Sequence, residues 1–141
     1  MKEAYTTEAQ NKKVEELHWE TQQWRSKLHF MQDEILFIER LLNSYVFQPN
    51  TLNLFERLQD YQRRLHKAKD TKAMLLGLIA KHEGDLGGML ECTDESCDLG
   101  YYQKHDKLKA EVVMCLQTFQ ELKSGIFNYA GGILKRRKPS K

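Results

Sequence analysis

The chain has 141 residues, a formal net charge of +2, three cysteines and two prolines. This length fits one domain, and so small a net charge implies no general affinity for nucleic acid. There is no apolar run of about 18 residues and no apolar stretch within the polar N-terminal segment 1–13, so we expect neither a transmembrane helix nor a secretory signal, and predict a cytoplasmic protein.

Apolar residues recur at steps of three and four along a first segment, which predicts a helix over about residues 7–47. Thr6 or Thr7 provides a cap at its start, and Pro49 ends it because proline disfavours the helical conformation at Gln48. A very tight connection is expected to follow. The stripe consists of Val14, Leu17, Thr21, Trp24, Leu28, Met31, Ile35, Ile38, Leu42 and Tyr45.

The same spacing predicts a second helix over about residues 51–90, weakened near its end by three glycines between residues 84 and 88. The acidic segment 91–98 is expected to follow as a loop of about ten residues. The stripe of this helix consists of Leu54, Leu58, Tyr61, Leu65, Ala68, Lys72, Leu75, Ile79, His82, Leu86 and Met89.

A third helix is predicted over about residues 100–134, followed by a disordered basic tail, 135–141. The tail is interpreted as solubilising, with weak binding to an anionic surface as the alternative. The stripe of the third helix consists of Tyr101, His105, Leu108, Val112, Cys115, Phe119, Leu122, Ile126, Tyr129 and Ile133. Cys115 is therefore expected to be a buried hydrophobe rather than a disulfide partner.

These elements predict an all-α protein, an elongated antiparallel three-helix bundle with coiled-coil-like heptad packing, in one domain over residues 1–134. Folding about Pro49 places residue i of the first helix beside about residue 99 − i of the second, and folding about Glu95 places residue j beside about 190 − j. The N-terminus and the acidic segment then share one end, opposite the basic tail. An arrangement with helices swapped between chains stays open.

This register brings His18, His82 and His105 into one layer, with Glu15 one turn from His18. Imidazoles that converge in a bundle core beside a carboxylate can bind zinc or iron, which would suit an oxidative enzyme. The alternative, which we favour, is that these histidines are end-of-core residues with solvated tips and that the protein has no cofactor.

Three further pairs are weaker candidates for metal binding. His29 with Asp33 and His66 with Asp70 are spaced four residues apart on outward faces, which is typical of solvated pairs. Cys92 and Cys97 lie in the acidic segment, without the spacing of a zinc knuckle. The sequence contains no nucleophilic triad, phosphate loop or dinucleotide motif, so an enzyme is not the favoured class.

Helix one carries more apolar residues than a three-helix core needs, namely Phe30, Leu36, Phe37 and Leu41. A helix that is apolar nearly all round must be covered on all sides. We therefore predict a protein that acts through protein–protein association, as a scaffold or adaptor, with these four residues at a homodimer interface.

Overall fold

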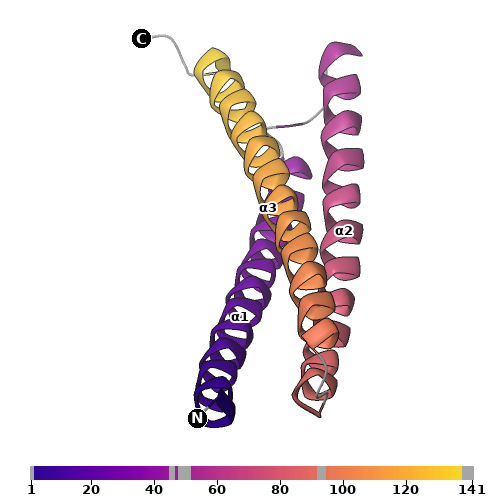
Figure 1. The fold of residues 1–141 in the computed structure, drawn as a ribbon. Helices are drawn as coiled ribbons and strands as arrows, with labels where there is room; N and C mark the ends of the chain where they lie inside the picture. Colours follow the sequence, from indigo (N-terminus) through magenta and orange to yellow (C-terminus); the bar gives the residue numbers. More distant parts are fainter. Residues whose placement is uncertain (1, 45–46, 48–51, 92–94, 138–141) are drawn as a thin grey trace.

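The computed structural model describes residues 2–44, 47, 52–91 and 95–137, and within them the side chains of 13–44, 47, 54–88 and 99–134. It contains three helices, α1 (Lys2–Leu42), α2 (Leu52–Glu91) and α3 (Glu95–Arg137), and no strand within the described residues (Figure 1). The prediction of an all-α three-helix bundle is confirmed.

Successive helices run in opposite directions, and each helix contacts the other two. The N-terminus lies at the same end of the molecule as the junction between α2 and α3, and the C-terminal end of α3 lies at the other (Figure 1). α1 and α3 are therefore parallel neighbours, and both are antiparallel to α2.

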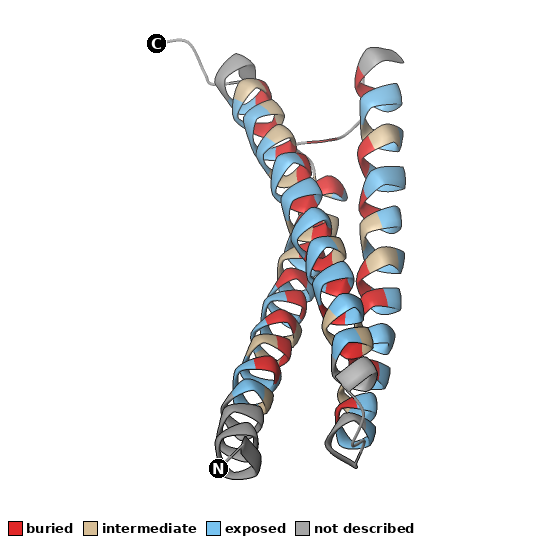
Figure 2. Cartoon of the chain, viewed as in Figure 1, coloured by how far each residue is buried: buried red, intermediate tan, exposed pale blue. Residues whose placement is uncertain are grey.

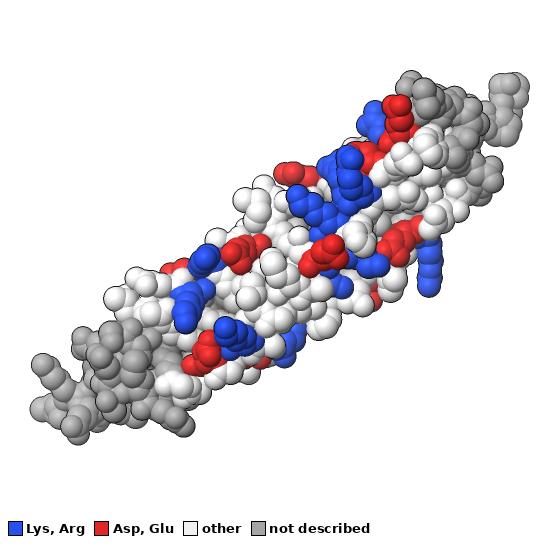
Figure 3. Space-filling view, turned by 90° about the vertical axis from the view of Figure 1, so that its right-hand side faces the viewer, with Lys and Arg blue, Asp and Glu red and all other residues white. Residues whose placement is uncertain are grey.

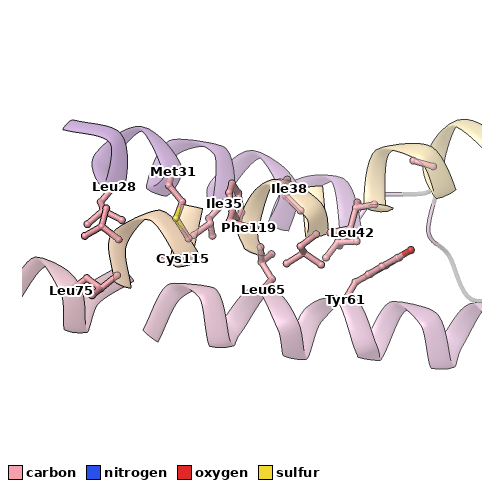
Figure 4. Close-up of a cluster of buried hydrophobic side chains, with 14 of the residues drawn as sticks. Leu28, Met31, Ile35, Ile38, Leu42, Tyr61, Leu65, Leu75, Cys115 and Phe119 are labelled. Carbon is pink, nitrogen blue, oxygen red and sulfur yellow. The ribbon is translucent and has the colours of Figure 1, made fainter. Parts of the chain in front are cut away.

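Each helix buries one stripe of side chains, seen as the red bands in Figure 2. Nearly all of the described stripe residues predicted from the spacing of three and four are buried; Val14, Leu58, Ala68 and Tyr129 are half-buried. Leu28, Ile38, Ile79 and Ile126 have no exposed surface at all. Figure 4 shows how side chains from all three helices converge in the longer of two apolar clusters.

Four of the predicted boundaries are wrong. α1 begins at Lys2 and ends at Leu42 instead of near residue 47, whereas α3 begins at Glu95 and continues to Arg137. The acidic residues from Glu95 onward were assigned to a loop, yet carboxylates are favourable in the first turn of a helix, where they complement its dipole. Basic residues suit a helix C-terminus for the same reason, and residues 135–137 of the predicted tail belong to α3. The remainder of that predicted tail, 138–141, lies outside the described residues.

The connection after α1 is also longer than predicted. At its start, Ser44 donates backbone and side-chain hydrogen bonds to the Leu41 carbonyl, and the Phe47 amide donates to the Ser44 carbonyl. The Phe47 side chain is 1% exposed and lies 6.2 Å from the Tyr129 ring of α3, measured between ring centroids. The connection therefore adds a residue to the core that helical spacing did not identify.

This longer connection changes the register between α1 and α2. Side-chain bonds join Gln22 and Arg25 to Glu83, Gln32 to Lys72, and Glu39 to Lys69. The residue numbers in these pairs add up to between 104 and 108, not to the predicted 99, so α1 is displaced along α2 by about one and a half to two and a half turns. Consequently Leu42 lies beside Gln62 and Leu65, and the first turns of α2 extend beyond the end of α1 (Figure 1).

Replacing Phe47 by Ala tests whether the connection belongs to the core. We expect the free energy of unfolding to fall by about 3–5 kcal/mol, because a buried aromatic side chain is lost and a cavity remains. Phe55→Ala is the matched control, since Phe55 is 44% exposed and should lose much less. Equal losses for the two variants in urea unfolding would contradict the burial of Phe47.

The glycines that were expected to weaken the end of α2 lie within a continuous helix. Gly84 is exposed, has no positive φ, and has no atom within 4 Å of the position that a Cβ would take. Gly84→Ala should therefore stabilise the protein by about 0.5–1 kcal/mol, because alanine loses less backbone entropy in a helix. Ala80→Gly, also at an exposed position of α2, should cost a similar amount in the same thermal unfolding measurement.

Candidate functional site

A layer of polar side chains crosses the core near the end of the bundle that holds the N-terminus. Thr21, His82 and His105, one from each helix, are all at most 5% exposed. The layer separates the long apolar cluster from a short one formed by Leu17, Leu86 and Tyr101. Polar groups buried this deeply need hydrogen-bond partners inside the protein.

Those partners form a chain of hydrogen bonds across the bundle. His82 Nε2 lies 2.9 Å from His105 Nδ1, and His105 Nε2 lies 2.7 Å from a carboxylate oxygen of Glu20, whose other oxygen accepts a bond of 2.9 Å from Lys109. A carboxylate only accepts, so His105 Nε2 carries a proton. When His105 is neutral, its Nδ1 is an acceptor and His82 Nε2 is the donor.

Aromatic rings enclose the two imidazoles. The Tyr101 ring stacks on His82 with 4.1 Å between centroids and 11° between planes, and Trp24 lies 4.6 Å from His105. The Tyr101 hydroxyl donates to the His82 carbonyl at 3.1 Å. Burial, reinforced by the nearby carboxylates of Asp85 and Glu83, raises the pKa of Tyr101 to about 12, so this hydroxyl remains a donor.

The environment shifts the pKa values of the two residues on either side of His105 in this hydrogen-bonded series, His82 and Glu20, for different reasons. Burial lowers the pKa of His82, and the positive charges that His105 and Lys104 can carry lower it further. Burial alone raises the pKa of Glu20, but the hydrogen bonds from Lys109 and His105 outweigh this and leave it below its ordinary value. A neutral His82 and an ionised Glu20 are therefore the forms that the fold favours near neutral pH.

The structure brings together two of the four residues predicted for a metal site. His82 and His105 are in direct contact, whereas His18 and Glu15 are exposed. The displaced register explains the difference, because it sets Trp24 and Glu20 of α1, not His18, beside His105. Among the described residues, no group of three or more His, Cys, Asp or Glu side chains is arranged to hold a metal ion.

The weaker metal candidates are distributed as follows. His66 Nε2 and Asp70 Oδ2 lie 3.6 Å apart, and both side chains are more than 70% exposed, which fits a solvated pair. His29 and Asp33 are exposed on α1. Cys92 and the side chain of Cys97 lie outside the described residues.

The predicted contact residues lie on two different flanks of α1. Phe30 and Phe37 are 64% and 59% exposed and border grooves between α1 and α3. Leu36 is 45% exposed and, at about 100° per residue, lies well round the helix from Phe37. Leu41 is half-buried and packs against the core of the same chain, so it belongs to the core more than to the exposed surface.

Sequence reasoning missed Phe127 of α3 as a neighbour of Phe37. The two rings meet edge to face with 6.3 Å between centroids, and Phe127 is 40% exposed. We call the surface formed by Phe30, Phe37 and Phe127 the aromatic face. Only the register of α1 beside α3 brings these residues together, so no local pattern could have identified the pair.

Comparisons with protein-family models, curated proteins and solved structures found no match to this chain. Within the described residues, no helix is long and apolar enough to cross a membrane. Function must therefore be inferred from the polar layer and the surface themselves.

Burial of a neutral His82 makes stability depend on pH. As the pH falls from about 7.5 to 5.5, the unfolded chain takes up a proton at His82 more readily than the folded chain, so the free energy of unfolding should decrease. His82→Gln, which keeps an amide donor for His105, should reduce this decrease. His18→Gln changes an exposed histidine and should leave it unaltered; urea unfolding at the two pH values distinguishes these outcomes.

Proposed function

We propose that this protein is a non-enzymatic helical bundle that works through protein–protein association, with the aromatic face as its contact surface and a second copy of the chain as the partner. The observation that carries the proposal is the exposure of Phe30 and Phe37 by about three-fifths of their surface, although both lie at the middle of a long amphipathic helix. Aromatic side chains are enriched in the buried centres of protein interfaces.

The shape of this surface supports the proposal. Two grooves, of about 450 and 190 Å³, follow the line between α1 and α3, and both are bordered by Glu34 and Lys123. Phe30 borders one groove, and Phe37 and Phe127 border the other. An aromatic side chain from a partner would therefore find both a recess and an exposed ring against which to pack.

Charges around the aromatic face suit pairing between two copies. Lys27 and Lys123 lie beside Asp33 and Glu34, so the surface carries both signs in equal number, and Lys123 already forms an ion pair with Glu34. A twofold axis can then set opposite charges against each other without like-charge repulsion. Leu36 would lie outside this surface.

The polar layer supports a structural interpretation better than a catalytic one. The neighbouring Thr21 hydroxyl donates to the His18 backbone carbonyl at 2.8 Å, so it is not directed at an imidazole. Within the described residues, no Ser, Thr or Cys side chain is hydrogen-bonded to His82 or His105 as an activated nucleophile would be.

The double variant Phe30→Ser with Phe37→Ser tests the contact surface. We expect a folded monomer where the unaltered protein is a dimer, because two aromatic anchors of an interface each contribute about 2 kcal/mol or more. Sedimentation equilibrium measures the mass, and circular dichroism checks the fold.

The matched control is Trp19→Ser with Phe55→Ser, which removes two exposed aromatic side chains from other parts of the surface. This control should remain a dimer. A monomeric unaltered protein, or a dimer that persists without Phe30 and Phe37, would exclude the aromatic face as a homodimer interface.

A further inference from the structure

A second and larger groove lies between α2 and α3, on a different side of the bundle from the aromatic face. Its volume is about 730 Å³, and it follows residues 64–75 of α2 and 107–122 of α3. These stretches correspond to about 16–23 Å of helix at 1.5 Å per residue, or three to four turns. The groove is therefore long enough to receive one helix of that length.

Small side chains make this groove possible. Ala68 and Thr71 of α2 and Ala110 and Thr118 of α3 line it, where larger residues would close the space. Cys115 lies in the groove but is only 7% exposed, and burial raises its pKa, so it serves as apolar floor and not as a reactive thiolate.

Two methionines border the groove with most of their surface uncovered. Met74 is 56% exposed and Met114 is 63% exposed, one on each helix. Methionine is flexible and polarisable, and it is frequent on surfaces that bind amphipathic helices. Because helices leave no unpaired backbone groups along their length, this surface cannot bind an extended strand through main-chain hydrogen bonds.

The charged residues at the groove are mostly basic. Arg64, Lys67 and Lys107 border it, against the single carboxylate of Glu111. Arg64 lies 3.6 Å from Asp60, whereas Lys67 and Lys107 form no ion pair within the described part of the chain. Figure 3 shows blue and red atoms interspersed along the face turned toward the viewer.

From these features we propose that the α2–α3 groove binds an amphipathic helix of another protein, with an apolar face of three to four turns and acidic residues on its flanks. The partner helix becomes the fourth of the bundle. A second copy suits this groove less well, because a twofold contact would bring together two copies of the same net-positive surface. This binding is independent of the aromatic face.

Two synthetic peptides of about 16 residues test the proposal, since this length matches the groove. Both carry the same apolar face of leucine and alanine; one has glutamate on its flanks and the other has lysine. By fluorescence anisotropy, we expect the glutamate peptide to bind about tenfold or more tightly than the lysine peptide, and salt to reduce the difference. Equal binding of the two peptides, or no binding of either, would overturn the proposal.

Protein variants locate the binding site. Ala110→Trp fills the groove from an exposed position and should weaken binding of the glutamate peptide about tenfold or more, whereas Ala80→Trp, exposed elsewhere on α2, should not. Lys67→Glu should weaken it as well, and Lys27→Glu, on the side of α1 and α3, should have no effect. Equal effects of a variant and its control would refute binding in this groove.

Sedimentation of the same variants separates the two surfaces. If the unaltered protein self-associated and the Ala110→Trp variant did not, the groove would be occupied by a second copy, and the acidic partner helix would be excluded. If Phe30→Ser with Phe37→Ser left peptide binding unchanged, the groove would act without the aromatic face, as proposed.

Discussion

The whole structure depends on the burial of one apolar stripe per helix. Helices of 41, 40 and 43 residues have little stability alone, because propensity contributes little compared with packing. Each stripe is wide enough to contact two neighbouring helices but does not surround its own helix. Each of the three helices therefore buries its stripe against the other two. The charged remainder of each helix then lies in water, where interhelical pairs such as Arg25 with Glu83 add only modest stability.

Apolar stripes alone do not fix how far one long helix slides along another, since a shift of seven residues presents a similar stripe. The buried polar layer removes this freedom. A slide of α1 by one heptad would place Lys13 or Lys27 where Glu20 now accepts a hydrogen bond from His105, leaving a buried imidazole facing a cation. The cost of a buried polar group without its partner thus selects the observed register. A part-buried bond, from Lys72 to Gln32 at 2.7 Å, also joins α1 to α2 in this register.

The sequence predicted what depends on local spacing and not what depends on register. The stripe residues, the burial of Cys115 and the exposure of Phe30 and Phe37 follow from positions along one helix. The partnership of Glu20 with His105 does not, because it joins residues 85 positions apart whose alignment is set by the connection after Leu42. Pro49 indicated a break but not that Phe47 would be buried beside Tyr129, so the expected turn was too short and His18 was assigned to the wrong layer.

A three-helix bundle of this length has three grooves, and the residues that border them differ in kind. At the aromatic face, exposed rings and a balanced set of charges border two grooves, which supports the proposed contact between two identical surfaces. Between α2 and α3, small side chains leave a recess bordered by methionine and by Lys67 and Lys107, which form no ion pair among the described residues, and this supports the proposed insertion of a different, acidic helix. The polar layer contributes to both surfaces, because only a bundle with one register presents Phe37 beside Phe127 and lines one groove with both Ala68 and Ala110. The internal hydrogen bonds of His105 thus help to determine which residues of different helices lie together at the surface.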